Sequence, residues 1–554
     1  MISRRKFFQA ATLGSVGLTL GSRAVASSAN MTAQAVLASA GTKGPASSGY
    51  SRMFPGLKPA VPPSPQDVEK GLHKLGEAMF DPNPPQIGME ENKPSSPPAG
   101  YTYLGQFIDH DLTLDLTPLS HAADSADDVA QIQNFRTPYF DLDQLYGGGP
   151  NLSPFLYQKN PAQRTKERFL IGKTSKGTPA DLPRNLQGIA LTGDPRQDEN
   201  LILAQMHVAF LKLHNLVISS RKEMAASPHY KQEGDSDFAI AQRVVRWHYQ
   251  WIVRHDYLET IVCESIAKKL EDMEKAKRVA PPVNFKIPVE FSMAAFRFGH
   301  SMVRNRYDSI SHTQKDVTLE KLLSLTGAQG LTPPGAQENT ALPDEWRVCW
   351  NRFFEILPTT SWINRAETID TKIAGTLHHL DEPHLKQFSA RVLGEAVEPS
   401  LPVRSLLRGF RAGLPSGEQV AAEVARRIPG INILKEGEII DGPHKDILKN
   451  PKYGFRNNTP LWYYILKEAE LEKVEVKDHK PQYGLSLGPV GSYIVADTMI
   501  GALVADRDSY VWSAGYPAWQ PTLEGVSAGE GKSMANLLAL VSSADDTEDN
   551  CDQP

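Results

Sequence analysis

The sequence predicts a mainly α-helical protein that forms one large domain with long loops and little β-structure. Apolar residues recur at helical spacing from Tyr101 onward, alternating apolar and polar runs are few, and no internal repeat is evident. A chain of 554 residues has the length of about three or four domains. The run of helical patterns favours a single domain instead.

The N-terminus has the three parts of a twin-arginine export signal. The run Ser3–Phe8 reads SRRKFF, a short apolar stretch extends from Ala10 to about Leu20, and Ala24–Ala26 offers a small-x-small cleavage site. The apolar stretch is too short to cross a bilayer. We therefore expect residues 1–26 to be a bacterial Tat signal peptide that the Tat export machinery recognises. The mature protein is then expected to be periplasmic or secreted, with no membrane span.

Composition divides the rest of the chain. Residues 27–75 are rich in Ala, Ser, Gly and Pro and predict an exposed leader or a wrapping arm. Residues 76–540 hold the helical patterns and are expected to form the domain. The acidic tail, residues 541–554, is expected to be disordered.

Six segments have the apolar periodicity of helices, and the first two are the longest. They are Leu201–Lys222, Phe238–Ile266, Glu290–Val303, Arg347–Ile356, Leu385–Val392 and Val490–Ala505.

Charge argues against a nucleic-acid partner. The chain has 59 Lys and Arg against 64 Asp and Glu, a net charge of −5, and no long basic run. Phosphate binding needs clustered Lys and Arg, so we expect no nucleic acid to bind.

The three cysteines, Cys263, Cys349 and Cys551, lie far apart in the sequence. They form neither a metal-finger spacing nor a disulfide framework. Buried free thiols are the expectation, and a single Cys263–Cys349 bridge is the alternative.

The stretch Gly105–Thr113, GQFIDHDLT, carries the strongest chemical signal. If it is helical, Gln106 and His110 lie one turn apart on one face, Asp109 lies beside them, and Asp111 points elsewhere. A histidine between two carboxylates is unusual in a mostly apolar stretch. Taken alone, such a histidine is more often a structural residue than a catalyst.

Three further segments add polar groups. Thr137–Asp143, TPYFDLD, has side-chain oxygens at alternating positions, which suits a calcium ion or, alternatively, a polar turn capped by aspartates. Gly193–Glu199, GDPRQDE, opens a helix. Phe296–His300, FRFGH, puts a histidine on an aromatic-rich helix.

These four segments, in this order, resemble the animal-type haem peroxidases of the peroxidase–cyclooxygenase superfamily, in a bacterial version. The resemblance covers roughly residues 95–525, and the motif GQFIDHD is its most specific part. Leu406–Gly417 and Leu487–Gly491 are similar to bacterial members as well. The resemblance implies a single helical haem-peroxidase domain that binds haem b and calcium.

On the distal side of the haem, the resemblance implies three catalytic residues. His110 matches the distal histidine that moves a proton between the two oxygens of hydrogen peroxide. Arg196 matches the arginine that stabilises charge on the departing oxygen. Gln106 matches the glutamine that hydrogen-bonds water or halide.

On the proximal side, His300 matches the ligand of the haem iron, which helps to stabilise the ferryl state that the family forms. The family usually has an asparagine that accepts the other ring proton, but this chain has Ser405 at the matching place. Because serine is shorter, a direct bond is not expected, and a water bridge is the alternative. Arg408 and Arg297 match arginines near the haem propionates.

Two acids, Asp109 and Glu199, match those that form ester bonds to haem methyl groups in mammalian members. Ester-linked haem is therefore a hypothesis for this chain. Myeloperoxidase-like enzymes have a methionine after the second acid, where this chain has Asn200. The extra sulfonium link cannot form, which argues against chloride as the favoured halide.

The calcium ligands implied by the resemblance lie in two segments. They are Asp111, Thr137, Tyr139 through its carbonyl oxygen, Asp141 and Asp143. A calcium ion held beside His110 would have a structural role and not a redox one.

The expected function is that of a haem-dependent peroxidase. It would reduce hydrogen peroxide and oxidise a small electron donor such as halide, thiocyanate or an organic molecule. Fatty-acid dioxygenases share the fold but store a radical on a tyrosine three residues before the proximal histidine, where this chain has Arg297. The other alternative is a non-catalytic secreted protein that stores haem or mediates adhesion.

Overall fold

The computed structural model describes residues 49–60, 64–81, 96–115, 129, 132–158, 167–219, 230, 235–327, 341–356, 363–380, 398–476, 480–513, 516, 519–521 and 533–543. Helices dominate these residues, and their strands form two short antiparallel pairs, β1–β2 and β3–β4. The prediction of a mainly α-helical fold with little β-structure is confirmed.

The regular elements are labelled in chain order. The α-helices of the first half are α2 (Pro65–Ala78), α3 (Gly100–Leu112), α4 (Asp143–Tyr146), α5 (Gly149–Leu152), α6 (Leu201–Ser219), α8 (Asp237–Ile252), α9 (Leu258–Ile261), α10 (Glu264–Ala267) and α11 (Leu270–Val279). Those that follow are α12 (Val289–Ser292), α13 (Leu319–Ser324), α16 (Leu401–Arg411), α17 (Gly417–Arg427), α18 (Glu436–Ile439), α19 (Lys445–Lys449), α20 (Leu461–Leu471), α21 (Pro489–Ala505) and α22 (Met534–Ser543).

Strands and tighter helices are short. The strands are β1 (Arg306–Ser309), β2 (Lys315–Thr318), β3 (Lys473–Val474) and β4 (Gln482–Tyr483). The 3-10 turns are η3 (Pro154–Leu156), η4 (Pro195–Asp198), η6 (Ala295–His300), η7 (Asp344–Trp346), η8 (Trp350–Arg352), η9 (Gly375–His378) and η11 (Tyr510–Trp512). A π-helical turn, η5 (Val253–Tyr257), joins α8 to α9.

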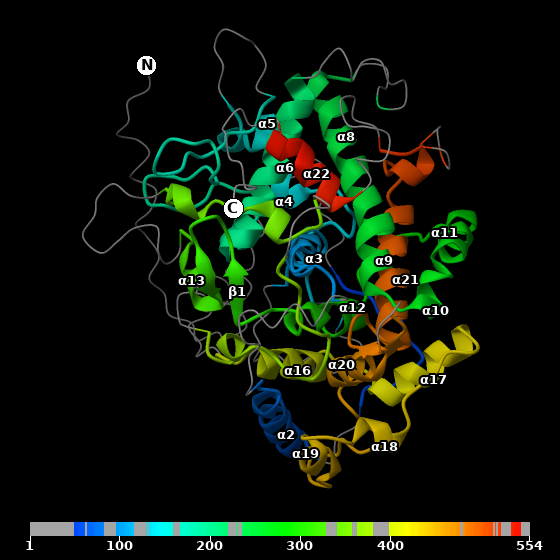
Figure 1. Ribbon diagram of the computed structural model, residues 1–554. Coiled ribbons are helices and arrows are strands. Elements are labelled where there is room, and N and C mark those ends of the chain that lie inside the picture. Colours follow the sequence, from blue (N-terminus) through cyan, green and yellow to red (C-terminus); the bar gives the residue numbers. More distant parts are fainter. Residues whose placement is uncertain are drawn as a thin grey trace, which may run out of the picture.

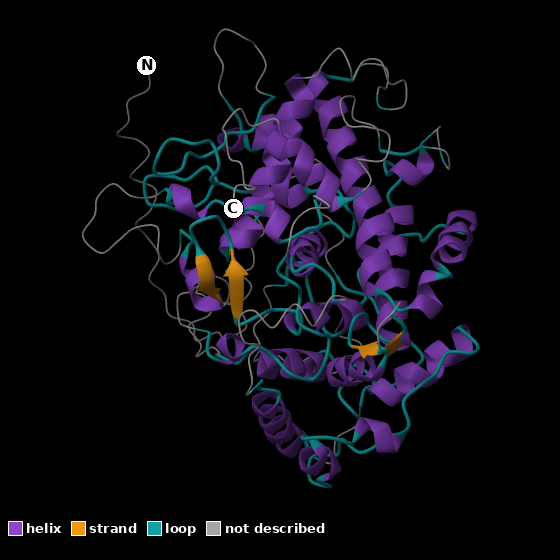
Figure 2. Cartoon of the chain, in the orientation of Figure 1, coloured by secondary structure: helices purple, strands orange, loops and turns teal. Residues whose placement is uncertain are grey.

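Helix α3 occupies the centre of the molecule. In Figure 1 it is seen nearly end-on, with α6, α8 and α22 above it and α12, α16 and α20 below it. Contacts of α3 with α6, η4, η5 and η6 agree with this view. Figure 2 shows how far helices outweigh strands around it. The GQFIDHD stretch therefore lies on an element surrounded by packed helices.

Aromatic packing holds α3 in this position. The Phe107 ring stacks on Phe210 of α6 with ring centroids 4.8 Å apart and meets Tyr249 of α8 edge-on. On another side, Gly105 allows close approach of η5, since a Cβ there would lie 2.4 Å from the Tyr257 hydroxyl. Such contacts of buried aromatic rings stabilise an interface beyond the area they bury.

Two predicted helices are confirmed, and one is confirmed with a different end. The predictions Leu201–Lys222 and Val490–Ala505 correspond to α6 and α21, except that 220–222 lie outside the described residues. Phe238–Ile266 was expected to be one helix, but α8, η5 and α9 end at Ile261. Val262 adopts an extended conformation there, and α10 starts anew.

Two other helix predictions are wrong, and Leu385–Val392 lies outside the described residues. Glu290–Val303 contains the last three residues of α12 and the 3-10 turn η6, because Ala294 leaves the helical region. Arg347–Ile356 contains only η8. Its backbone instead pairs with distant segments: Cys349 N donates to Ile310 O, and Arg352 O accepts from Asn364 N. Tertiary hydrogen bonds overrode the apolar periodicity in this segment.

Helix α6 is a core helix despite its composition. Among the described residues, it alone is long and apolar enough to cross a membrane, which the sequence analysis did not anticipate. However, 83% of its most apolar window is buried inside the protein.

The described part of the predicted arm packs on the domain. Tyr50 and Phe54 are buried in the main hydrophobic core, and α2 packs against α16. The predicted signal peptide, residues 1–26, lies outside the described residues, as does the tail beyond Ser543.

The cysteines follow neither expectation completely. Cys263 is a buried free thiol, whereas Cys349 is disulfide-bonded. A Cys263–Cys349 bridge is therefore excluded.

Candidate active site

His110 lies near the C-terminal end of α3 and is only 4% exposed. Its Nε2 is 3.7 Å from Glu199 Oε2, and its Nδ1 is 3.3 Å from Gln197 Nε2. Burial, together with the positive charge of Arg196, holds the pKa of His110 well below its usual value of 6.5. The imidazole is therefore neutral near pH 7 and can accept a proton.

A chain of hydrogen bonds orders the groups next to His110. Asn200 Nδ2 donates to Gln106 Oε1, and Gln106 Nε2 donates to Glu199 Oε2, each over 3.0 Å. Asn200 Oδ1 in turn accepts from Leu203 N in the first turn of α6. Burial raises the pKa of Glu199 to about 7, although Arg196 opposes the shift. Glu199 can thus hold or release a proton near neutral pH.

Arg196 is locked in place by its neighbours. Its Nη2 donates to the carbonyl oxygens of Thr113 and His110 over 2.6 and 3.2 Å. Nη2 also donates to Asp194 Oδ2 over 2.8 Å, and Nε lies 3.2 Å from both Asp194 oxygens. The guanidinium therefore stays beside the end of α3 in one orientation.

His300 ends the 3-10 turn η6, which contacts both α3 and α20. The Ser405 hydroxyl of α16 lies 3.4 Å from His300 Nδ1, so the two residues make direct contact, contrary to expectation. The Trp462 ring of α20 meets the imidazole edge-on, with centroids 6.1 Å apart. Burial lowers the pKa of His300 to about 3, with further contributions from Arg297 and Arg404. A neutral imidazole with Nδ1 engaged leaves Nε2 for a metal.

Two arginines, Arg297 and Arg404, act electrostatically on His300, and Arg408 acts on both of them. Burial and the charge of Arg408 lower the pKa of Arg297 to about 10, and the same two causes lower the pKa of Arg404. Arg297 Nε donates to Ser292 O, and Arg408 Nη1 lies 3.5 Å from Asp115 Oδ2. Partly buried cations that disfavour one another's charge form a site for anionic groups.

The acids near His110 and the arginines near His300 interact electrostatically. Arg297 lowers the pKa of Asp109, which burial raises overall, and Glu199 opposes the lowering of the Arg404 pKa. Asp109 Oδ1 also accepts from Thr113 Oγ1 over 2.9 Å. The two acids predicted to contact a haem rim therefore lie within electrostatic reach of the arginines near His300.

A second cluster lies on the other face of α3. Oxygens of Asp111, Asp141 and Asp143 lie within 4.8 Å of one another. Asp111 is fully buried beside Tyr249, but neither of its carboxylate oxygens has a hydrogen-bond partner of normal geometry. Burial and then the other two acids raise its pKa well above the usual range. Three converging hard oxygen donors of this kind fit a divalent cation.

The chain around this cluster is shaped for convergence. Leu142 has a left-handed backbone (φ 58°) between the two aspartates, and Asp143 N donates to Asp141 Oδ1. Thr137 Oγ1 donates to Asp141 Oδ2 over 2.9 Å. Tyr139, whose carbonyl was a predicted ligand, lies in the same bend.

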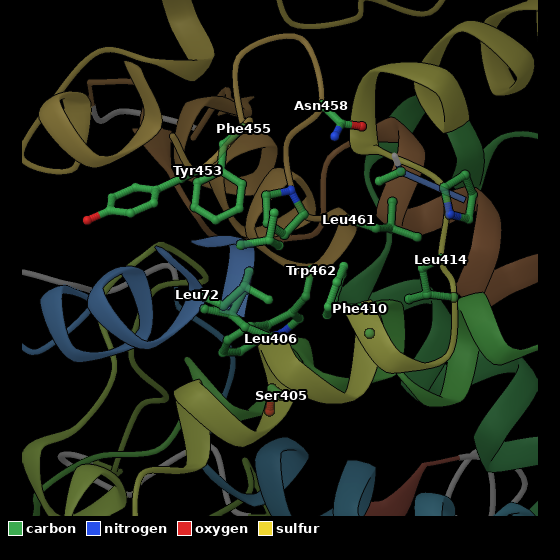
Figure 3. A pocket seen from close by; sticks show the side chains of 15 residues that line it. Leu72, Ser405, Leu406, Phe410, Leu414, Tyr453, Phe455, Asn458, Leu461 and Trp462 are labelled. Atoms are coloured by element: carbon green, nitrogen blue, oxygen red, sulfur yellow. The ribbon is translucent and has the colours of Figure 1, made fainter. Parts of the chain in front are cut away.

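An apolar pocket lies behind the Ser405 side of α16. In Figure 3, Leu72, Leu406, Phe410 and Trp462 surround it, and Ser405 lies at its edge. Ser405 and Trp462 thus contact His300 on one side and line this pocket on the other.

The sequence analysis missed several residues of the site. Asp194, which holds Arg196, lies within the GDPRQDE segment, but no pattern in that segment predicts its role. Gln197, Arg404 and Arg136 were also missed. Their one available signal was position, because each is next to or near a predicted residue.

Residues 117–329 match the family model described as animal haem peroxidase. This stretch begins just after α3 and includes Arg196, Glu199 and His300. Peroxidasin of Drosophila melanogaster is 26% identical over 202 residues, which are 34% of this chain and 13% of the relative. The chain thus spans a small part of that relative's length.

Solved structures share the fold. Peroxidase A from Dictyostelium discoideum matches with a TM-score of 0.51 and 18% identity over 83% of this chain and 88% of that one. A fatty acid alpha-dioxygenase of Arabidopsis thaliana matches with a TM-score of 0.53 and 13% identity over 87% and 76%. Over part of its length, the chain is therefore similar to animal haem peroxidases, and its fold is similar to that of these solved structures.

Proposed function

We propose that this protein is a haem peroxidase that reduces hydrogen peroxide and oxidises a small electron donor. The observation that carries the proposal is the buried, neutral His110, ordered beside Glu199 and a locked Arg196. A haem-storage or adhesion protein has no need of an acid–base group in such surroundings.

The residues on the His300 side fit a haem. His300 would hold the iron through Nε2, and the partly buried arginines Arg297, Arg404 and Arg408 would receive the propionates. When bound, haem supplies the redox chemistry that the side chains lack.

His110 moves the proton. As a neutral imidazole it takes a proton from one peroxide oxygen and delivers it to the other, which leaves as water. Gln197 supports this task, because its Oε1 is buried without a partner. Turning the Gln197 amide over places Oε1 against a protonated Nδ1 and leaves His110 Nε2 as the acceptor.

Arg196 stabilises negative charge, and Gln106 presents a fixed amide beside His110. The fixed positive charge of Arg196 near the end of α3 stabilises negative charge on the departing oxygen without reorganisation. Gln106 is held by Asn200 and Glu199 and so presents a fixed amide beside His110.

The carboxylate cluster is proposed to bind calcium through Asp111, Asp141 and Asp143, with Thr137 and the Tyr139 carbonyl as the remaining ligands. The unpartnered, buried Asp111 supports this, since two buried oxygens without donors call for a cation. Calcium would neutralise the cluster and fix the segment that follows His110.

Asp109 and Glu199 are proposed to form ester links to the haem. Their position within electrostatic reach of the arginines near His300 supports this assignment. Acid treatment followed by solvent extraction tests it, and haem that leaves freely would contradict it. Because Asn200 excludes the sulfonium link, thiocyanate, other halides or small organic donors are favoured over chloride.

Fatty-acid dioxygenation is the second candidate, since alpha-dioxygenases share the fold. Arg297 argues against it, because the radical-storing tyrosine is expected at that position. Rapid oxygen uptake with linoleate or arachidonate would reverse the ranking.

Export by the bacterial Tat machinery to the periplasm or outside the cell is also proposed, on the sequence pattern of residues 1–26. Replacing both Arg4 and Arg5 with Lys should retain the protein in the cytoplasm. Export that continues undiminished would exclude the Tat route.

Absorption spectra of the purified haem protein, before and after adding hydrogen peroxide, test the main proposal. His110→Ala should leave haem bound but slow the reaction with peroxide about 100- to 10,000-fold. His248→Ala, at a buried histidine on α8 whose Nδ1 bonds Val244 O, is the matched control. Unchanged turnover in His110→Ala would refute the assigned mechanism.

A further inference from the structure

We infer that Arg136 and Asp194 form a bridge that couples cation binding in the carboxylate cluster to the position of Arg196. The inference rests on the proposed calcium and haem sites and adds a positioning device between them.

Arg136 spans the gap between the two sites. Its Nη1 lies 3.1 Å from Asp143 Oδ1 in the cluster, and its Nη2 lies 2.5 Å from Asp194 Oδ2. The same Asp194 oxygen accepts from Arg196 Nη2 over 2.8 Å. One carboxylate thus joins two guanidinium groups, and one of them also contacts the cluster.

The bridge is fully inside the protein. Asp194 is 0% exposed and Arg136 is 5% exposed. Despite burial, which opposes it, Arg136 and Arg196 hold the pKa of Asp194 well below its usual range. Breaking such a buried ion pair would leave one charge uncompensated. Arg136, Asp194 and Arg196 therefore move as one unit.

The backbone reinforces the link. Gly193 N donates to Gln144 O over 3.0 Å, and a Cβ on Gly193 would lie 2.6 Å from the carbonyl oxygens of Asp143 and Gln144. The loop that carries Arg196 therefore rests directly on the segment that carries the cluster. A shift of that segment displaces the arginine loop.

Hydrogen bonds of Asn134 connect the backbone of Arg136 to the C-terminal end of α3. Asn134 Oδ1 accepts from Leu114 N and from Arg136 N, and Asn134 Nδ2 donates to Leu112 O. Arg196 Nη2 in turn holds the Thr113 carbonyl. Both ends of the bridge are therefore hydrogen-bonded, through Asn134 and Arg196, to the segment Leu112–Leu114 that follows His110.

Charge gives the coupling its direction. Without a cation, Asp143 and Asp111 of the cluster attract the Arg136 guanidinium in competition with Asp194. A bound cation would satisfy these carboxylates and leave Arg136 to Asp194, which keeps Arg196 seated. By linkage, a ligand that needs a seated Arg196 must in turn strengthen cation binding.

The test measures binding and not turnover. Calcium affinity of the haem-free protein is measured by calorimetry, and cyanide affinity of the haem protein is measured with calcium and with a chelator. For the wild type we expect calcium to tighten cyanide binding about fivefold or more. Arg136→Met should abolish that difference and Asp194→Asn should reduce it, while Arg136→Lys should restore part of it.

Arg254→Lys is the matched control, because Arg254 is equally buried and pairs with Glu274 away from the cluster. It should keep the wild-type coupling. Full coupling in folded Arg136→Met or Asp194→Asn would overturn the bridge while leaving the calcium and haem assignments intact. Failure of the wild type to bind calcium would instead refute the calcium site and the bridge with it.

Discussion

Ser405 stands where the haem peroxidases that this chain resembles usually have an asparagine. Its hydroxyl lies 3.4 Å from His300 Nδ1, near the upper limit of a hydrogen bond. A weak acceptor at this place withdraws the Nδ1 proton less than an amide oxygen would. The imidazole is therefore a poorer electron donor to an iron bound at Nε2.

Ser405→Ala should raise the iron reduction potential slightly, because the remaining interaction at Nδ1 is lost. Ser405→Asn should lower the potential, because an amide oxygen reaches closer to Nδ1. Spectroelectrochemical titration of the haem proteins measures both shifts. Ser492→Ala, at a fully buried serine on α21, is the control. Equal potentials in all four proteins would show that Ser405 does not act through His300.

At the scale of single residues, the sequence predicted which residues lie together but not which side chains form pairs. The carboxylates of Asp111, Asp141 and Asp143 lie together as expected. The ion pair of Arg136 with Asp194 spans 58 positions, and no local pattern announces it. Side-chain pairs of this kind depend on the packing of whole elements, which periodicity does not encode.

Among the elements, α21 has an unusual N-terminus. Glu468 of α20 accepts hydrogen bonds there from Val490 N and Gly491 N over 2.9 and 3.3 Å. Gly488 permits this approach, since a Cβ would lie 2.2 Å from Glu468 Cγ. The Glu468 carboxyl oxygen replaces a capping side chain for α21, whose first amides have no partner within the helix.

Glu468 should make stability fall as the pH rises. Burial raises its pKa from 4.5 to about 8, so between these values the folded state keeps a proton that the unfolded state releases. Its stabilising contribution is complete below pH 4.5 and is lost as the pH rises through about 8. Glu468→Gln should remove a slope on the order of 1 kcal/mol per pH unit.

Urea unfolding of both proteins at several pH values from 5 to 8 measures this difference. Glu423→Gln is the control, because Glu423 is partly exposed on α17 and its pKa is lowered to about 2 by Arg426 and Arg427. It should not change the slope in this window. Parallel pH profiles for the wild type and Glu468→Gln would contradict the prediction.

Helix α21 was predicted with nearly correct bounds, whereas the segment around His300 was not. The run from Pro489 to Ala505 is apolar on all sides and begins with proline, which suits the first turn of a helix. In Glu290–Val303 the backbone leaves the helix at Ala294, where Phe291 and Phe296 stack 4.6 Å apart. Packing of aromatic rings decided the conformation there.

For the whole molecule, the carboxylate cluster is a cross-link. It joins α3 to the bend before α4 and lies against Tyr249 of α8. Without a cation, the buried Asp111 faces two partly buried acids, Asp141 and Asp143, which costs free energy on folding. A bound ion therefore stabilises the packing of segments that are distant in sequence.

Removal of calcium should lower the melting temperature. With free calcium at about 100 times its Kd, the ion contributes about 2.7 kcal/mol to stability. Differential scanning calorimetry with calcium and with a chelator measures the loss. Asp141→Asn should melt at a lower temperature and respond little to either treatment. A wild-type melting temperature that ignores the chelator would exclude the site.

The sequence by itself determined the helical class, the lengths of α6 and α21, and which residues are candidates for the site. These properties are local, because they follow from apolar periodicity and from motifs a few residues long. Only the tertiary structure decided that Glu199 faces His110 and that Ser405 reaches His300. It also decided that Arg136 and Asp194 lie between the carboxylate cluster and Arg196. Such contacts join residues far apart in the chain, and their distances are set by how the helices pack around α3.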